Sequence, residues 1–463
     1  MPAPSIAPAA MNTRLARSLD KLADMTRARL SCLTPWIALL ALAAGCGDDS
    51  ASTGLYEGDS ADEGGSGVSA SGAGSGLYEE GGAEGDSADP GDPSGDPSGE
   101  PGGTGSAEAG DEEGSGGGEP VNPEPGQLTA GEWRDLDHWD FWQGLQQNAT
   151  WQPVIAAWKF ATQERFSVVV ESGGEHVVDA GVTLLAGQAP VWSARTDAHG
   201  EAELFAGMFA AAPEGARSLQ VTVAGKSTIV EAVAAGGMTP IVVDLEAAEA
   251  PAQVLDLMFV IDTTGSMGDE LSYLQVELAD VIERVRQAVG QSVKFRVSVN
   301  FYRDAGDDYV VRPFPFTEDI DAAIEDLNQQ SANGGGDWPE AVDAGLSDAI
   351  EGHDWSESAV ARLCFIVLDA PPHEGDEVLG DVQASVAAAA ERGVRIVPLA
   401  ASGADKPLEF LLRQMAIATG GTYTFLTNDS GIGGVHVEPT IGEYQVEILN
   451  DLLVRVISAA LVD

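Results

Sequence analysis

The chain has 463 residues, enough for two domains with linkers, and its formal net charge at pH 7 is −51. Such a charge argues against nucleic acid and anionic membrane surfaces as partners that are bound by charge attraction, although much of the acid lies in one segment. The three cysteines, Cys32, Cys46 and Cys364, leave no even-numbered framework outside the N-terminal region, so disulfides do not hold the fold.

A basic stretch and then an apolar stretch lie near the N-terminus. Residues 30–44 are largely apolar but too short to cross a membrane comfortably, and they lead into Leu42-Ala-Ala-Gly-Cys46. This arrangement resembles a bacterial lipoprotein signal. The resemblance implies a signal segment at residues 1–46, with Cys46 acylated and held in a lipid bilayer of the cell envelope, the outer membrane or cell surface being favoured. The alternative is an ordinary cleaved secretory signal with an incidental cysteine.

Residues 47–127 consist mainly of Gly, Ser, Asp, Glu, Ala and Pro and contain no Lys or Arg. Such a segment cannot bury enough apolar surface to order itself, so we expect a disordered acidic linker. Repulsion between its charges favours an extended chain. Behind a lipid anchor, this linker would hold the folded part away from the membrane.

Residues 128–164 form a tryptophan-rich segment. Five large rings in so short a stretch must either pack against a neighbouring domain or bind a ligand such as a carbohydrate, and we favour packing. The five rings are Trp133, Trp139, Trp142, Trp151 and Trp158.

Residues 165–248 predict a small all-β sandwich. Short alternating stretches separated by glycine-rich turns are typical of antiparallel strands in two packed sheets. Thr196-Asp-Ala-His-Gly200 resembles a turn of carboxypeptidase-regulatory and transthyretin-like domains, and we interpret the sandwich as a spacer or accessory binding module. The strands are expected at 166–170, 181–185, 191–195, 202–205, 219–223 and 241–245.

Residues 252–463 alternate apolar strands with amphipathic helices, which predicts a doubly wound, Rossmann-like α/β domain. Ligands of such sheets bind beyond the carboxyl ends of the strands. The strands are expected at 254–261, 293–302, 309–312, 363–368, 394–399 and 422–426, and the helices at 269–289, 320–328, 339–350, 377–391, 408–419 and 443–461.

Oxygen-bearing side chains follow the first of these strands. Asp262, Thr264 and Ser266 stand at alternate positions, so an extended loop would point all three the same way, and Gly265 permits close backbone approach. Oxygen ligands of this kind suit a hard divalent cation such as Mg²⁺. The alternative is a plain strand–turn–helix junction in which Thr or Ser caps the helix.

Two further loops are expected at the same edge of the sheet. Residues 333–340 contain three consecutive glycines followed by Asp337, and Asp369 comes directly after a buried strand. Three such loops at one edge are stronger evidence for a ligand site than any one of the motifs alone.

These stretches together resemble the metal-ion-dependent adhesion site of von Willebrand factor type A domains, nearest the hemicentin-like members. The resemblance implies that Thr264 and Ser266 bind the metal directly and that Asp262 and Asp369 act directly or through water. The family usually supplies a threonine where this chain has Trp338, and Asp337 is our substitute for that ligand. The cation would be Mg²⁺, or else Mn²⁺ or Ca²⁺, and an open coordination position would accept a carboxylate from a protein ligand.

Other candidate residues have simpler interpretations. We predict that Cys364 is a small buried residue of a strand, that His373 lies at the surface, although it could also approach the metal loop, and that the acidic turn at 304–308 is solvated. The chain carries no His-rich zinc set, no Ser–His–acid arrangement and no Walker-type loop. A cation-dependent binding module is therefore favoured over a structural factor with a decayed site and over a metal-dependent hydrolase.

Overall fold

A computed structural model describes residues 123–336 and 338–461 of the chain. The predicted signal segment with Cys46, nearly all of the predicted linker, and Asp337 lie outside the described residues. In the described ranges, none of the helices has both the length and the apolar character that crossing a membrane requires.

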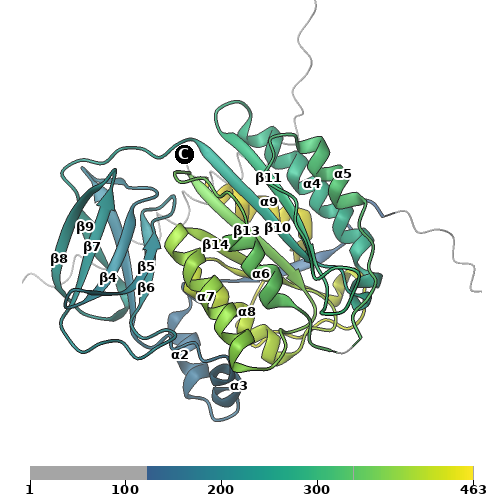
Figure 1. Ribbon diagram of the computed structural model, residues 1–463, viewed down its shortest axis with the longest axis horizontal. Coiled ribbons are helices and arrows are strands. Elements are labelled where there is room, and N and C mark those ends of the chain that lie inside the picture. The colour runs from purple at the N-terminus through teal and green to yellow at the C-terminus, as the bar shows by residue number, and fades with distance from the viewer. Residues whose placement is uncertain (1–122, 337, 462–463) are drawn as a thin grey trace, which may run out of the picture. The chain divides into compact units, whose positions relative to one another are not determined.

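A mostly parallel sheet of eight strands dominates the second half of the chain (Figure 1). The strand order is β12-β11-β10-β13-β14-β15-β1-β16, in which the five central strands run parallel and the strands at the two edges pair antiparallel. The central strands are β10 (Val254–Asp262), β11 (Lys294–Tyr302), β13 (Ala361–Leu368), β14 (Val394–Ala400) and β15 (Tyr423–Leu426); the others are β12 (Val311–Arg312), β1 (Thr129–Trp133) and β16 (Glu447–Ile448).

Helices cover both faces of this sheet, because side chains of the central strands are buried on both sides. Along β10, Leu257 and Phe259 belong to one apolar core, whereas Met258 and Val260 belong to the other. The predicted doubly wound α/β fold is therefore confirmed. The first core holds α4 (Leu271–Val289), α5 (Ile320–Asn328) and α9 (Leu449–Ala459), and the second holds α6 (Val342–Glu351), α7 (Asp376–Arg392) and α8 (Lys406–Thr419).

Two predicted helices begin later than their apolar periodicity suggested. Helix α6 starts at Val342 rather than Pro339, because Glu340 is held in a bridge to Pro372 instead of a helical turn. Helix α9 starts at Leu449 rather than residue 443, because residues 447–448 pair with β1 as β16. The remaining boundaries lie close to the predicted ones, and α5 coincides with residues 320–328.

Residues 165–244 form two four-stranded sheets, and the predicted sandwich strands are all present. The arrangement is not purely antiparallel as predicted, because the last strand pairs parallel to the first, and two short or exposed strands were not predicted. One sheet holds β3 (Glu175–His176), β2 (Arg165–Ser172), β6 (Glu201–Phe205) and β9 (Gly236–Asp244); the other holds β5 (Ala189–Arg195), β4 (Gly181–Ala186), β7 (Arg217–Val223) and β8 (Lys226–Val233).

The tryptophan-rich segment packs against the rest of the fold, as favoured from the sequence. Its first part is β1, so the large sheet is not confined to the predicted range 252–463. Beyond it lie α2 (Trp139–Gln147) and α3 (Gln152–Ala157). Trp142 is fully buried, and its indole N–H donates to the Thr162 hydroxyl at 2.9 Å.

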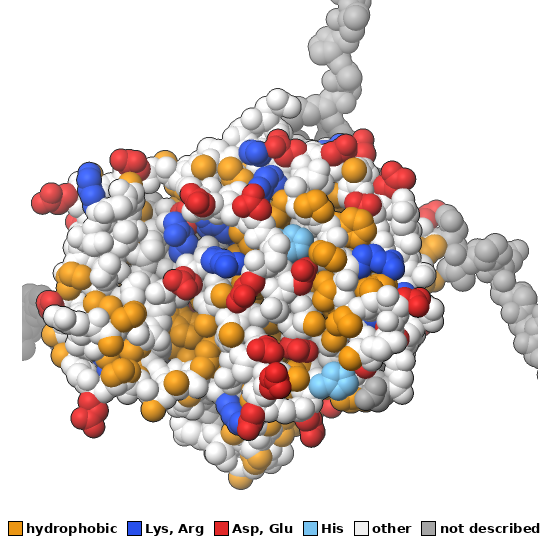
Figure 2. Space-filling model, viewed as in Figure 1, with side chains coloured by type: hydrophobic (Ala, Val, Ile, Leu, Met, Phe, Trp, Pro, Cys, Tyr) orange, Lys and Arg blue, Asp and Glu red, His pale blue; other side chains and the backbone are white. Residues whose placement is uncertain are grey.

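One apolar core continues from the sandwich through α7 and α8 into the large sheet. Charged contacts reinforce this interface. The Asp179 carboxylate of the sandwich accepts hydrogen bonds from Arg195 at 2.6 Å and Arg362 at 2.8 Å. Burial alone would raise the pKa of Asp179, but the two guanidinium groups outweigh it and lower the pKa below its ordinary value. On the outside, acidic side chains are scattered over the whole face shown in Figure 2, with apolar side chains exposed between them.

A buried ion-pair network joins the tryptophan-rich segment to α8. Arg413 is fully buried and donates to Asp135 at 2.6 Å and to Glu409 at 3.0 Å. We expect Arg413→Met to lower the free energy of unfolding by about 3–5 kcal/mol, because it leaves the buried Asp135 carboxylate without its cation and leaves Glu409 only its ion pair with Lys406. Denaturant unfolding followed by circular dichroism measures this.

The matched control is Arg286→Met, because Arg286 pairs with Asp321 at the exposed surface at 3.2 Å. We expect that change to have little effect on the free energy of unfolding, because solvent screens exposed ion pairs. Equal effects of the two substitutions would show that burial of the network contributes nothing.

Candidate functional site

The carboxyl end of β10 brings together three of the predicted site residues. Asp262 is fully buried, and one of its carboxylate oxygens accepts hydrogen bonds from the Thr264 backbone N–H at 2.8 Å and the Thr264 hydroxyl at 2.7 Å. The Thr264 and Ser266 hydroxyls lie 3.1 Å apart. Because the Thr264 side chain binds Asp262 and makes no capping bond to the 3₁₀ helix η1 (Gly265–Asp269), the alternative of a plain capped junction is wrong.

Asp369 reaches the same place from the neighbouring strand. Strand β13 lies beside β10 with Ile261 opposite Val367, so the residues that follow the two strands meet at one edge. Asp369 is buried, and the charge of its carboxylate raises the pKa of Asp262. Four of the five predicted metal ligands are therefore placed together, and the fifth, Asp337, lies outside the described residues.

Backbone hydrogen bonds hold the glycine loop against the β10 loop. Gly265 N–H donates to the Gly334 carbonyl at 3.1 Å, and Asn333 N–H donates to the Thr263 carbonyl at 3.0 Å. Gly335 has φ +70°, and a Cβ there would lie 2.9 Å from a carboxylate oxygen of Glu340. Glycine is required at this position because a side chain would be strained and would collide with the site.

Glu340 is a site residue that the sequence reasoning missed. Its side chain is 3% exposed, and its backbone N–H donates to the Pro371 carbonyl at 3.0 Å, which holds it beside the Asp369 loop. The charges of Asp262 and Asp369 both act on it. The sequence placed Glu340 in the first turn of a helix, and only its position at the end of the glycine loop could have marked it.

Three buried carboxylates, Asp262, Glu340 and Asp369, thus lie near one another. Burial, with the charge of Asp369, raises the pKa of Asp262 to about 7. Burial, with the charges of the surrounding acids, raises the pKa of Glu340 to about 8. Burial also raises the pKa of Asp369 to about 6, although its contact with Ser266 lowers it. The acids are therefore poorly stabilised as anions by the protein alone.

The same site has oxygens without a partner. Asp262 Oδ2, Asp369 Oδ1 and Glu340 Oε2 are buried and have no partner within hydrogen-bonding geometry. Neither has the buried hydroxyl of Tyr302, which acts on Asp262 and lowers its pKa. Buried polar atoms normally have partners, and carboxylate and hydroxyl oxygens are the donor set that hard divalent cations prefer. In the described part of the chain no three His, Cys, Asp or Glu side chains form a metal cluster by themselves, so a cation here would also depend on the Thr264 and Ser266 hydroxyls.

The acidic turn at 304–308 supports this edge of the sheet. Asp304 is buried, and the Asp307 carboxylate accepts from the backbone N–H groups of Asp304 at 3.1 Å and Gly335 at 2.9 Å. The prediction of a solvated turn is therefore wrong for these two acids. His373, predicted at the surface, is partly exposed, but its Nε2 lies 2.6 Å from Asp304 Oδ1. Cys364 is buried as predicted, and burial raises the pKa of its thiol to about 12.

A buried histidine–glutamate pair, which the sequence did not reveal either, holds the long connection between β15 and β16. His436 Nε2 lies 2.8 Å from Glu270 Oε1, and both side chains are buried. The other oxygen of Glu270 accepts from Ser402 N–H at 3.1 Å. The connection is thereby attached to the start of α4, next to the β10 loop.

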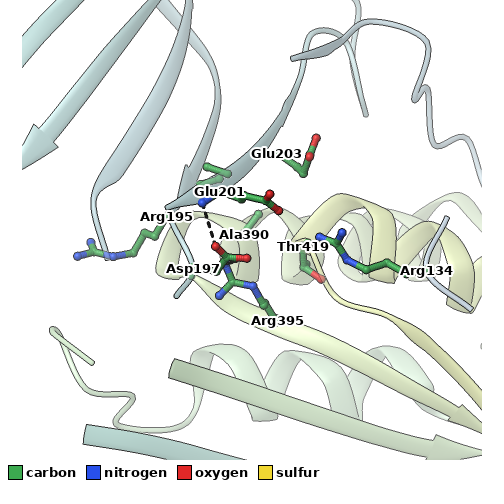
Figure 3. A pocket seen from close by; sticks show the side chains of 12 residues that line it. Arg134, Arg195, Asp197, Glu201, Glu203, Ala390, Arg395 and Thr419 are labelled. Carbon is green, nitrogen blue, oxygen red and sulfur yellow. Dashed lines mark hydrogen bonds and ion pairs between the residues drawn. The ribbon is translucent and has the colours of Figure 1, made fainter. Parts of the chain in front are cut away.

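A separate small cavity lies between the sandwich and the large sheet (Figure 3). Its volume is about 10 Å³, and its walls carry arginines from both parts and acids from the sandwich. Arg395 forms an ion pair with Asp197 at 3.7 Å, and burial lowers the pKa of Arg395. Because of its size and its paired charges, we assign this cavity to the interface and not to a ligand.

The site predicts an unusual pH dependence for the metal-free protein. A carboxyl whose pKa is raised in the folded state binds more protons folded than unfolded, so its contribution to stability is present at low pH and is lost as pH rises. The window runs from the ordinary aspartate pKa of 3.8 to about 7 for Asp262. In EDTA, we expect Asp262→Asn to raise the free energy of unfolding at pH 8 by on the order of 2 kcal/mol and to have little effect at pH 4.

Calorimetric melting at the two pH values checks this. Asp308→Asn, which removes an exposed acid from the neighbouring turn, is the control and should melt like the wild type at both. A stabilisation by Asp262→Asn that is the same at pH 4 and pH 8 would contradict the raised pKa of Asp262.

Comparison with known proteins agrees with this geometry. Residues 256–431 match the family model described as the von Willebrand factor A domain. The chain is 36% identical over 94 residues to von Willebrand factor A domain-containing protein 7 of Mus musculus and of Homo sapiens, which is 20% of this chain and 10% of each relative. It is 31% identical over 123 residues to an ariadne-like RING finger protein of Acanthamoeba polyphaga mimivirus, which is 26% of this chain and 11% of that protein.

The chain thus spans about a tenth of the length of the curated relatives that it matches. Within it, a mostly parallel sheet lies between two layers of helices, and the β10 loop stands at its carboxyl edge. Residues 256–431 are a von Willebrand factor A domain, a kind of domain that is generally a protein-binding module.

Proposed function

We propose that this protein is a lipid-anchored protein of the bacterial cell envelope whose von Willebrand factor A domain binds a protein ligand through a divalent cation. The observation that carries the proposal is the set of three buried carboxylates with unpartnered oxygens beside two hydroxyls. An ion of charge +2 would give these oxygens a partner and remove the repulsion that raises their pKa values.

Each site residue has a distinct part in this proposal. Thr264 and Ser266 would bind the cation directly, and Asp262 and Asp369 would bind it directly or through water. Glu340 is the added acid, and its unpartnered oxygen lets it hold the cation or a water on it. Asp337 remains our proposed substitute for the threonine ligand that the family usually supplies. When bound, the ion, Mg²⁺ or else Mn²⁺ or Ca²⁺, supplies an electrophilic position for a carboxylate of the ligand.

Two alternatives remain as competing proposals. The first is a structural or assembly factor with a degenerate metal site, which is kept open by Trp338 standing where the family has a threonine. The second, less favoured, is a hydrolase that uses the same metal. The hemicentin-like resemblance adds no more specific partner. Metal-dependent turnover of a substrate would favour the hydrolase, and ligand binding that survives a chelator would favour the structural factor.

Isothermal titration of the mature chain with MgCl₂ tests the cation. We expect one bound ion in the wild type and an affinity reduced roughly 100-fold or more in Asp262→Ala, because even outer partners of metal ligands contribute about 10- to 100-fold. Asp308→Ala removes an exposed acid from the same region and should bind like the wild type.

The ligand is tested in the same preparations by a pull-down from envelope extract. We expect capture by the wild type in Mg²⁺ and its loss in EDTA, in Ser266→Ala and in Asp262→Ala. Capture that Asp262→Ala and EDTA leave unchanged would remove the cation from the binding mechanism.

The anchor is a separate part of the proposal and rests on Leu42-Ala-Ala-Gly-Cys46. We expect the wild type to enter the detergent phase of a Triton X-114 partition and Cys46→Ser to stay in the aqueous phase, because acyl chains add about 0.8 kcal/mol of membrane affinity per buried methylene. Wild-type protein that remains aqueous would instead favour an ordinary cleaved signal.

A further inference from the structure

Two exposed apolar residues belong to segments that reach the candidate metal site. The side chain of Trp338 is 44% exposed, and that of Val435 is 81% exposed. The first belongs to the glycine loop and the second to the connection between β15 and β16, so they come from segments almost a hundred residues apart. We call Trp338 and Val435 the apolar rim.

Gly403 links the rim to the site. A Cβ built on Gly403 would lie 3.9 Å from Asp369 Oδ2 and 3.9 Å from two ring carbons of Trp338. The indole and the carboxylate are therefore no more than twice that distance, about 8 Å, apart. The Gly403 N–H donates to the Val435 carbonyl at 3.0 Å, which places Val435 next to the same point.

The backbone on both sides of Val435 is firmly attached, so this valine is not part of a loose loop. Gly434 packs close to Asp269 and Ser402, and His436 is buried against Glu270. On the other side of the rim, Glu340 N–H bonds to the Pro371 carbonyl two residues after Trp338. Apolar side chains presented in fixed positions next to a polar site are typical of a surface that contacts a partner.

The charge around the rim limits what can dock there. Asp269, Asp304 and Asp307 lie in the loops of this edge, and the chain as a whole carries a formal charge of −51. A ligand segment with several acids would be repelled, whereas one carboxylate directed at a cation would not. Of the exposed large apolar residues, Trp338 and Val435 lie on the segments that reach Gly403.

We propose that Trp338 and Val435 select a protein ligand that carries a large apolar side chain next to the carboxylate it offers to the cation. This inference rests on the proposed function, because the carboxylate is placed by the cation. The site then recognises two features of one short segment: a single acid, and an aliphatic or aromatic neighbour that packs on the rim. The departure from threonine at position 338 changes what is recognised and not only how the ion is held.

A displayed peptide library tests the inference without a known ligand. Each peptide carries one fixed Asp with three randomised positions on either side, and the library is selected on the full mature chain in MgCl₂. We expect large apolar residues to be enriched about tenfold at a position adjacent to Asp, and this enrichment to disappear on the double variant Trp338→Ala/Val435→Ser. Trp338→Phe should retain it.

Two controls distinguish an effect on the apolar rim from an effect on metal binding. The double variant should bind Mg²⁺ by calorimetry as the wild type does, because neither side chain offers an oxygen. Ile229→Ser removes an exposed apolar side chain from β8 of the sandwich and should keep the wild-type peptide preference.

The possible outcomes are distinct. If the wild type binds no Mg²⁺, the proposed function itself fails. If Mg²⁺ binds but no apolar position is enriched, if Lys or Arg is enriched in its place, or if the double variant keeps the apolar preference, the proposed function stands and the inference about the rim is overturned.

Discussion

The main physical constraint on this domain is that its fold removes several carboxylates from water at the carboxyl edge of the large parallel sheet. Asp262 and Asp369 follow two adjacent strands whose residues are buried on both faces, so the fold carries both acids out of water. Glu340 adds a third. Charges that are removed from water and placed near one another are costly unless they are protonated or paired with a cation. The raised pKa values of Asp262 and Glu340 and the carboxylate oxygens without hydrogen-bond partners both result from this loss of water.

The apolar cores of the fold supply the stability that the carboxylates at this edge of the sheet do not. Two apolar cores enclose the sheet, and one of them extends into the sandwich. Several acids that are buried away from the site are paired with cations: Arg413 binds two acids, and Asp179 accepts hydrogen bonds from two arginines. Within the described residues the contrast is clear, because the charges acting most strongly on Asp262 and Glu340 are those of other acids. This contrast is the physical basis of our proposal that the three acids bind a cation.

Much of the fold and of the candidate site could be predicted from local sequence patterns. The features that were missed depend on contacts between residues far apart in the sequence. The apolar runs of β10 and β13 gave the central strands, and the acids after them gave the site edge. Strand β1 was not recognised as part of the large sheet, because its partners β15 and β16 lie about three hundred residues later. Gly131 is needed there because a Cβ would lie 2.5 Å from Phe425, which no local pattern indicates.

Glu340 was missed for a related reason. The periodicity of residues 339–350 fits a helix, but a bridge between Glu340 and Pro372 delays the helix and turns the acid toward the site. The solvated turn was likewise inferred from composition, whereas Asp307 in fact receives two backbone N–H groups. Composition alone does not show which acids the backbone will enclose.

In the site that we propose, an indole at position 338 in place of a threonine would have a physical consequence for recognition. Three ionised carboxylates would more than balance the charge of a divalent cation, so its remaining attraction for a further carboxylate would be weak. Charge pairs of this kind orient a ligand more reliably than they add affinity, since both partners must lose water. Apolar contact has no comparable desolvation penalty and increases with the area buried. In the proposed mode of binding, the exposed Trp338 would therefore add the affinity that the ion does not supply: the cation would position the acid of the ligand, and contact with the apolar rim would decide which acid-bearing segments stay bound.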